Sequence, residues 1–244
     1  MHPILAKIGP LTLYSYGLMV ALGFIVGALL ASRLAPRFGI PPEKITTLSL
    51  VILLSGIFGA RLLYVLLNIK DFIPDPLEAL KLSHGGLAFH GGAFAAFIFG
   101  LIYVKRARLP LWDTLDLLSP YIVLGHAIGR IGCFLNGCCY GKPYTGITAV
   151  VFGDGTARYP TQIYSALLLI LLYCILRFFL QRRRFKGQVF FLYLMLYSAA
   201  RFFVEFLRGD NTLFLPGLTV AQVISIAVFI TGIAGYGLNG KRKY

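Results

Sequence analysis

Long apolar stretches separated by short polar breaks dominate the chain. A helix that crosses a membrane needs about 20 apolar residues. The pattern predicts an all-α, polytopic membrane protein: a bundle of about seven transmembrane helices in a single domain over residues 1–244. The expected spans are, approximately, Leu11–Ser32, Ile45–Leu67, Gly86–Val104, Leu111–Phe134, Pro160–Leu180, Gln188–Leu207 and Leu215–Tyr236.

Two of the breaks are long enough to have a structure of their own. Asp71–Ser83 mixes apolar and charged residues, so it is either a segment lying flat at the membrane interface or an ordinary connecting loop. Leu135–Tyr159 is the largest polar piece and is rich in glycine and tyrosine. We expect it to form a small soluble cap on the outer, periplasmic side of the bundle.

Composition and charge support this interpretation. The chain is 58% hydrophobic and 13% charged, whereas soluble domains are about 45–50% apolar and about 25% charged. A net charge of +14 would suggest nucleic acid in a soluble protein. In a membrane protein, however, basic residues collect in the cytoplasmic loops. We therefore expect no nucleic-acid partner.

The positions of the basic residues predict the orientation. Most of them lie after the first, third and fifth expected spans and in the tail, which places the N-terminus outside and the C-terminus in the cytoplasm. These residues are Arg33, Arg37, Lys44, Lys105, Arg106, Arg108, Arg182, Arg183, Arg184, Lys186, Lys241, Arg242 and Lys243.

Several charged residues fall inside the spans, where a charge at the helix centre costs about 2.5–3.5 kcal/mol and usually has a partner or a role. Arg201 and Glu205 stand four residues apart and share one helix face with Tyr197 and Arg208. A structural ion pair is one interpretation. Two arginines against one glutamate leave a positive charge, however, and the arginine fork suits a phosphate.

Two further arginines lie in other spans. Arg130 follows His126 by four residues, so one helix face carries both. Arg61 follows Gly56 and Gly59, small residues that let another helix approach closely. Arginines that converge from different helices would form a site for an anionic lipid headgroup.

His90 and Tyr16 are the remaining polar candidates at the outer ends of spans. His90 stands among four glycines in the segment 85–92, which suggests a bare backbone that lines a cavity. A histidine can accept a proton near neutral pH, although a structural polar residue is the alternative. Tyr16 either belongs to the interfacial aromatic belt or reaches into the site.

Three cysteines cluster at the outer end of the fourth expected span and just after it. Cys133, Cys138 and Cys139 would face the oxidising side, where a disulfide from Cys133 to Cys138 or Cys139 is plausible. Three cysteines without a paired histidine motif indicate zinc only weakly, so no metal is assigned. A thiol redox site is the stronger alternative. Cys174 stands alone in a span and is interpreted as a packing residue.

Taken together, these motifs resemble the prolipoprotein diacylglyceryl transferase family from the first span to the last. The family signature is similar to the segment from Gly129 to Gly141, and the elements around His90 and Arg201 occur in the family's order. The matching residues are Gly129, Arg130, Gly132, Phe134, Asn136 and Gly141; His90-Gly91-Gly92; Arg201, Glu205 and Phe206; Tyr16-Gly17; Gly59-Ala60-Arg61; Tyr159-Pro160; and Gly217 through Gln222.

The resemblance implies a reaction in the bacterial inner membrane. A diacylglyceryl group would pass from phosphatidylglycerol to the lipobox cysteine of a prolipoprotein, releasing glycerol phosphate, without a metal or organic cofactor. His90 is the expected base, and Arg130 and Arg201 the expected groups that stabilise the phosphate. Substrate binding is expected from Arg130, Tyr16, Asn136, Arg61, Glu205, Arg208 and Gly141, with Glu205 holding Arg201.

The chain departs from the family pattern at two positions. Cys133 stands where the family has asparagine, and Cys138 where it has glutamate. A diverged thiol oxidoreductase that uses Cys133, Cys138 and Cys139 is therefore the main alternative function. A small-solute transporter or a non-catalytic lipid-binding protein is a second alternative.

Overall fold

A computed structural model describes residues 2–8, 11–81, 86–209, 213–215 and 217–241, and most of these residues are helical. The α-helices in these ranges are α1 (Ser15–Leu34), α2 (Pro42–Leu67), α3 (Ile69–Phe72), α4 (Phe89–Arg106), α5 (Leu111–Asn136), α6 (Thr161–Gln181), α7 (Gln188–Glu205) and α8 (Val220–Gly240). Two 3-10 helices, η1 (Ala35–Phe38) and η2 (Pro76–Leu80), lie between them. The strands are β1 (Ile4–Ile8), β2 (Leu11–Tyr14), β3 (Val150–Val151), β4 (Ala157–Arg158), β5 (Leu213–Leu215) and β6 (Leu218–Thr219).

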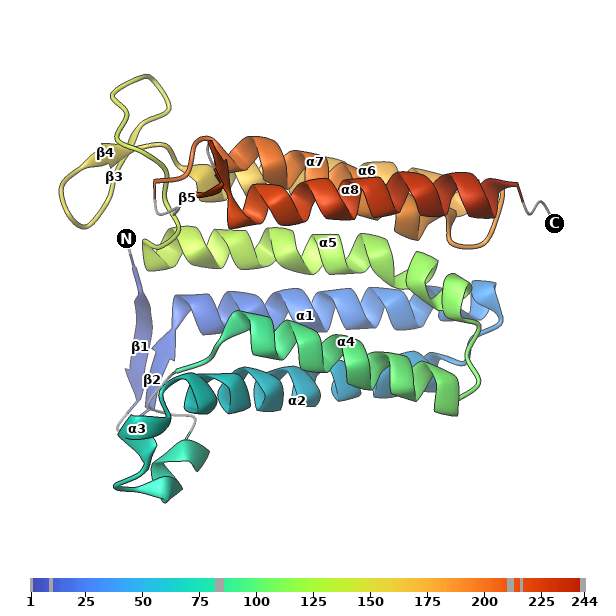
Figure 1. The fold of residues 1–244 in the computed structure, drawn as a ribbon, viewed down its shortest axis with the longest axis horizontal. Coiled ribbons are helices and arrows are strands. Elements are labelled where there is room, and N and C mark those ends of the chain that lie inside the picture. The colour runs from blue at the N-terminus through green and yellow to red at the C-terminus, as the bar shows by residue number, and fades with distance from the viewer. Residues whose placement is uncertain (1, 9–10, 82–85, 210–212, 216, 242–244) are drawn as a thin grey trace. The chain divides into compact units, whose positions relative to one another are not determined.

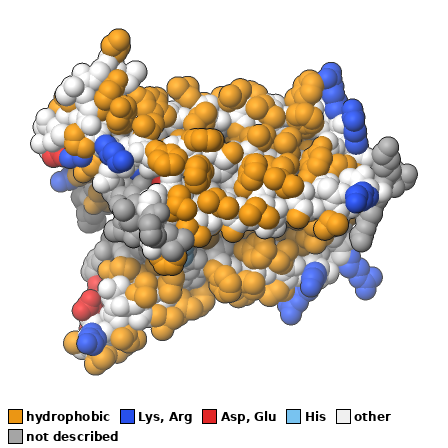
Figure 2. Space-filling view, turned by 45° about the horizontal axis from the view of Figure 1, so that its top comes forward, with side chains coloured by type: hydrophobic (Ala, Val, Ile, Leu, Met, Phe, Trp, Pro, Cys, Tyr) orange, Lys and Arg blue, Asp and Glu red, His pale blue; other side chains and the backbone are white. Residues whose placement is uncertain are grey.

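The expected polytopic all-α membrane protein is confirmed. Among the described residues, six helices are long and apolar enough to cross a membrane: α1 with η1, α2, α5, α6, α7 and α8. The third expected span corresponds to α4, an 18-residue helix that includes His90 near its start and Lys105 and Arg106 at its end. Large apolar side chains cover the outward sides of the helices (Figure 2). A lipid environment would cover these side chains.

The chain divides into two compact units. Unit 1 comprises Met1–Ala31 and Trp112–Tyr244, and unit 2 comprises Ser32–Leu111. The expectation of a single domain over the whole chain stays a prediction.

Close backbone contacts join the helices of unit 1. A Cβ added to Gly23 of α1 would lie 2.6 Å from the carbonyl oxygen of Gly125 in α5. A Cβ added to Gly232 of α8 would lie 2.7 Å from Met195 Cγ and 3.2 Å from the backbone nitrogen of Met195 in α7. Helices α5 to α8 run alongside one another in Figure 1. Lipid supplies no hydrophobic drive for helix association, so small residues that allow close van der Waals packing are used instead.

Three antiparallel hairpins, β1–β2, β3–β4 and β5–β6, lie at helix ends in unit 1 (Figure 1). They correct two expected spans. Leu11–Tyr14 is strand β2, and α1 begins only at Ser15, whose backbone N–H and hydroxyl both donate to the Pro3 carbonyl. The last helix begins at Val220 and not at Leu215, because Thr219 and Gln222 form a capping box.

The expected outer cap, residues 135–159, consists of the end of α5, turns and the short β3–β4 hairpin. Arg158 in β4 forms an ion pair of 2.7 Å with Asp154 and stacks 4.6 Å from the ring centroid of Tyr140. Its hydrogen bond holds the pKa of the Asp154 carboxyl below the usual value. These contacts keep the hairpin closed.

Unit 2 is built on the packing of α2 against α4. A Cβ on Gly59 would lie 2.6 Å from the carbonyl oxygen of Gly91, and a Cβ on Gly92 would lie 2.8 Å from that of Gly56. The small residues of α2 therefore receive another helix, as expected. The sequence suggested a bare backbone that lines a cavity at this place. Instead, Gly91 and Gly92 serve the contact with α2 inside an intact helix. Gly85 lies outside the described residues.

The segment after α2 folds into α3 and η2, with Ser83 outside the described residues. Arg61, which is 8% exposed, reaches it from α2. Its guanidinium donates to the carbonyl oxygens of Ala79 and Glu78, at 2.8 and 2.7 Å, and to that of Gly86 at 3.2 Å. Arg61 thus holds this segment against α2.

A buried ionic cluster joins α5 to the turn between α6 and α7 in unit 1. Arg183 contacts Asp113 at 2.7 Å and Asp116 at 3.3 Å. Asp116 is fully buried and also accepts the backbone N–H groups of Gly187 (2.8 Å) and Phe190 (2.9 Å). One carboxylate therefore satisfies donors at the start of α7, which have no partner within the helix.

We predict that Asp116→Ala lowers the free energy of unfolding by about 3–5 kcal/mol, because it leaves the backbone N–H groups of Gly187 and Phe190 without their acceptor and removes one of the two carboxylates that contact half-buried Arg183. Asp154→Ala, which removes an exposed ion pair, should change it by less than about 1 kcal/mol. Denaturant unfolding in detergent micelles measures both. Equal effects of the two substitutions would contradict this assignment.

A second prediction contrasts two glycines. Gly59→Ala should lower the free energy of unfolding by about 1–3 kcal/mol, since the new methyl meets the α4 backbone. Gly237→Ala adds the same methyl to α8 where no atom beyond its chain neighbours and its own helix backbone lies within 4 Å, and it should leave stability unchanged or slightly raised. Thermal unfolding of the two variants side by side checks the difference.

Candidate functional site

A cleft in unit 1 lies between α5, α6 and α7, close to the helix ends that carry the cap. Its volume is about 300 Å³, including space open to the surroundings. One part of the wall is polar, and the rest is apolar. The lining residues are His126, Arg130, Ser165, Leu168, Leu169, Tyr197, Ala200, Arg201 and Val204.

On the α5 side of the cleft, the side chain of Arg130 is held by a hydrogen bond to His126. Arg130 Nε donates to His126 Nε2 at 3.2 Å. The ring of Tyr197, from α7, lies 5.7 Å from that of His126 between centroids. Because Nε is used in the hydrogen bond to His126, the terminal nitrogens of the guanidinium are the donors that can bind an incoming acceptor.

The α7 wall presents Arg201 in an ion pair. Arg201 Nη1 lies 2.6 Å from Glu205 Oε2, and the carboxylate is almost completely buried. Glu205 Oε1 accepts the hydroxyl of Thr219 at 2.9 Å. Thr219 is the N-cap residue of α8, and its hydrogen bond to Glu205 places the start of α8 against the end of α7. A chain of contacts from α8 through Glu205 therefore orients Arg201 in the cleft.

The end of α7 is joined to the cap by backbone contacts. Gly141 pairs with Arg208 in an isolated antiparallel bridge, and Lys142 N donates to Leu207 O at 2.9 Å. A Cβ on Gly141 would lie 2.6 Å from Leu207 O and Tyr159 Cβ. Glycine is required at this position by packing, which is a sufficient physical reason for its place in the motif.

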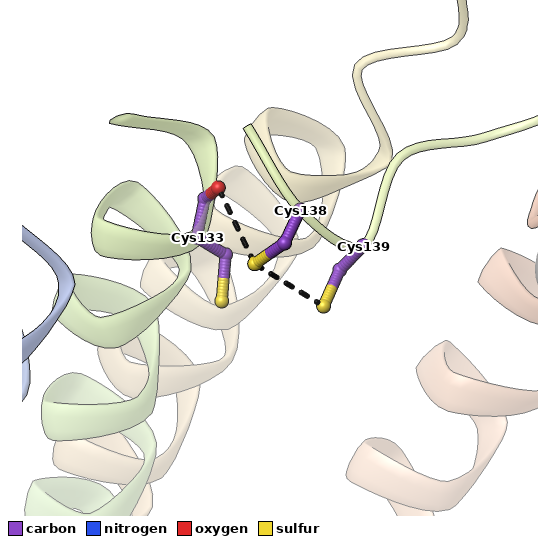
Figure 3. Close-up of side chains that lie close together, drawn as sticks. All are labelled: Cys133, Cys138 and Cys139. Carbon is purple, nitrogen blue, oxygen red and sulfur yellow. Dashed lines mark hydrogen bonds between the residues drawn. The ribbon is translucent and has the colours of Figure 1, made fainter. Parts of the chain in front are cut away.

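The three clustered cysteines come together where α5 ends. Cys133 is buried in α5, Cys138 and Cys139 follow in the next turn, and all three sulfur atoms lie within 4.8 Å of one another (Figure 3). All three are free thiols. Hydrogen bonds with the Cys133 and Cys139 side chains hold the pKa of Cys138 below its usual value.

The other residues expected at the site are distributed as follows. Tyr16, in α1, is 45% exposed and packs beside Gly132 of α5, and Asn136 is the last residue of α5. His90 and Arg61 belong to unit 2, where His90 is exposed on the first turn of α4. The structure brings Arg130 and Arg201 into one cleft, with Glu205 behind Arg201. The expected catalytic and binding roles stay predictions.

Sequence reasoning assigned no role to His126, Thr219 or the pair Asp113 and Asp116. His126 had a visible signal, since it precedes Arg130 by one helical turn. Thr219 was detectable from the Thr-x-x-Gln spacing of a capping box before an apolar run. Asp113 and Asp116 are acidic residues at the start of an apolar stretch, and their partner Arg183 is too distant in sequence to be paired with them by pattern.

The fold and the cleft define a polytopic membrane protein with two arginines at the polar end of an otherwise apolar cleft. The prolipoprotein diacylglyceryl transferase family model matches residues 3–238, and the chain belongs to this family. It is 34% identical to the phosphatidylglycerol--prolipoprotein diacylglyceryl transferase of Clostridium tetani over 100% of both chains.

Proteins of the same name show similar agreement. The Bacillus cereus protein is 34% identical over 94% of this chain and 89% of its own length. The Halalkalibacterium halodurans protein is 32% identical over 93% and 82%. Family membership favours the transferase interpretation over the thiol oxidoreductase.

We predict that Thr219→Ala lowers the free energy of unfolding by about 1–2 kcal/mol, because it removes both the helix cap and the hydrogen bond to buried Glu205. Thr219→Ser keeps the oxygen and should restore most of this loss. Thr231→Ala is the matched control, since that hydroxyl is exposed and donates only to Ala227 within α8. A Thr231 effect as large as the Thr219 effect would contradict the assignment.

Proposed function

We propose that this protein transfers a diacylglyceryl group from phosphatidylglycerol to the lipobox cysteine thiol of a prolipoprotein. One observation carries the proposal: in a chain of the transferase family, Arg130 and Arg201 come from different helices to the polar end of one cleft. Two guanidinium groups on a partly apolar wall match the phosphodiester and acyl chains of an anionic lipid.

The reaction is a displacement at carbon. The thiolate sulfur attacks the carbon of the diacylglycerol moiety that is esterified to the phosphate, the new S–C bond forms, and the bond from that carbon to the phosphate oxygen breaks. Its electron pair leaves with the phosphate oxygen, so the products are a thioether and glycerol phosphate. Negative charge grows on the departing phosphate, and this is the charge that Arg130 and Arg201 would stabilise.

The apolar wall suits the rest of the donor. Leu168 and Leu169 of α6 and Val204 of α7 line the cleft beside the arginines. Helices α6 and α7 expose apolar residues to lipid, among them Leu167 and Phe203. A phosphatidylglycerol molecule could therefore place its headgroup at the arginines while its acyl chains stay in an apolar environment.

The supporting roles follow from the contacts. His126 is a positioning residue, because its Nε2 accepts from Arg130 and directs the guanidinium. Glu205 positions Arg201. We retain His90 as the base for the acceptor thiol, and Tyr16, Asn136 and Arg208 as contributors to substrate binding. Arg61 and Gly141 would contribute through the segments that they hold in place.

The orientation of the chain belongs to the same proposal. In unit 2, Lys44 Nζ of α2 donates to Ala107 O at 2.9 Å, so the basic segments after α1 and α4 meet. In unit 1, the basic turn between α6 and α7 meets the start of α5. We assign these segments to the cytoplasm, which leaves the cap and the cleft on the outer side of the membrane. Arg242 and Lys243 lie outside the described residues.

The test uses purified full-length protein in detergent with phosphatidylglycerol and a lipobox peptide. Mass spectrometry should detect the diacylglyceryl adduct on the peptide cysteine and released glycerol phosphate. We predict that Arg130→Gln lowers the rate by about 100-fold or more, since it removes a donor that acts on the developing charge. Arg37→Gln, which changes an exposed arginine in η1, is the matched control and should retain the wild-type rate.

Two comparisons complete the assay. A lipobox peptide with serine in place of cysteine, or phosphatidylethanolamine in place of phosphatidylglycerol, should give no adduct. An adduct formed equally by Arg130→Gln would remove Arg130 from the site. Absence of any adduct from folded wild-type protein, with thiol oxidation of the peptide instead, would favour the oxidoreductase alternative.

A further inference from the structure

The sulfur atoms of Cys133, Cys138 and Cys139 are spaced as metal ligands are spaced. All three lie within 4.8 Å of one another, and Cys138 Sγ and Cys139 Sγ are 3.7 Å apart. A disulfide brings its sulfurs to about 2.05 Å. A tetrahedral zinc ion with Zn–S bonds of about 2.3 Å separates its sulfurs by about 3.8 Å. The Cys138–Cys139 distance of 3.7 Å is close to this value, and an upper limit of 4.8 Å for the other two leaves all three sulfurs within reach of one ion.

Backbone contacts hold two of these cysteines in place. Cys138 N donates to Cys133 O at 3.1 Å, which closes the turn after α5. Cys139 has a φ of 62°, a left-handed backbone conformation that residues other than glycine rarely adopt. This conformation turns the chain so that two consecutive cysteines place their sulfurs together (Figure 3).

The start of α6 supports the same turn from the other side. Gln162 Nε2 donates to Cys138 O at 2.6 Å, and Thr161 Oγ1 donates to Cys139 O at 2.8 Å. Gln162 and Thr161 are both buried, at 0% and 2% exposed. The cysteine turn is thus built between α5 and α6 before any ligand arrives, and such preorganisation lowers the cost of binding.

We propose that Cys133, Cys138 and Cys139 form a three-thiolate site for a soft metal cation, with Zn²⁺ as its representative. Thiolate sulfur selects Zn²⁺ or Cu⁺ over hard cations such as Mg²⁺ and Ca²⁺. Binding of Zn²⁺ by three thiols releases up to three protons and forms three Zn–S bonds without oxidation or reduction. Three protein ligands leave a fourth position open to water.

Such a site would lock the beginning of the cap onto α5. Cys133 lies one helical turn beyond Arg130. The turn that holds Cys138 and Cys139 leads directly to Gly141, which pairs with Arg208 just beyond α7. A bound metal would link these elements where the family pattern has asparagine and glutamate. The metal site does not depend on the proposed transfer reaction.

Metal binding is tested on the purified full-length protein. The protein is purified with reductant, stripped with a chelator, loaded with Zn²⁺ and desalted, and its zinc is counted by elemental mass spectrometry. We expect one zinc per chain, and a site that Mg²⁺ at the same concentration does not fill. Cys133→Ser, Cys138→Ser and Cys139→Ser should each weaken binding by about 100-fold or more. Cys174→Ser, which removes the isolated cysteine of α6, should keep the zinc.

A second measurement needs no variant. Zn²⁺ should protect Cys133, Cys138 and Cys139 from alkylation by iodoacetamide, and removal of the metal by a chelator should restore labelling, as peptide mass spectrometry reports. Failure of the wild-type protein to retain zinc would overturn the proposal, as would zinc retained by Cys138→Ser. A disulfide among the three cysteines that persists under reductant would also overturn it.

Discussion

The absence of water in the membrane core requires a partner for every charge that the helices carry, and α7 shows how this requirement shapes unit 1. At the start of α7, buried Asp116 accepts the backbone N–H groups of Gly187 and Phe190 and contacts Arg183. At its end, Glu205 pairs with Arg201 and accepts from Thr219 of α8. Both ends of α7 are therefore held by carboxylates, and the cleft wall between them is well positioned.

The same requirement explains why the cleft suits an anion. Glu205 offsets the charge of Arg201, whereas Arg130 is supported by a histidine nitrogen that carries no negative charge. The polar end of the cleft therefore keeps a net positive charge in surroundings that are otherwise apolar. A phosphate bound there replaces lost hydration with charge-assisted hydrogen bonds. The fold supplies the position of the site, while the chemistry depends on these few side chains.

Sequence patterns predicted the long helices well, because apolar length alone specifies a membrane span. They also placed Arg201 and Glu205 on one face, since i, i+4 spacing is local. The strands β2 and β5 were missed because apolar residues at span ends are compatible with either structure. The ionic cluster around Asp116 and the hydrogen bond from Thr219 to Glu205 join residues that are distant in sequence, so sequence patterns did not predict them. The glycines near His90 suggested a bare backbone that lines a cavity, but Gly91 and Gly92 are explained by their close approach to Gly59 and Gly56 inside the intact helix α4.

The most direct test of the central claim is an experimental structure of the protein with phosphatidylglycerol bound in a lipid nanodisc. The account predicts density for the headgroup phosphate within hydrogen-bond distance of both Arg130 and Arg201, with acyl chains leaving along the apolar wall formed by Leu168 and Val204. A phosphate bound away from both arginines, with the cleft filled by side chains or water, would contradict it.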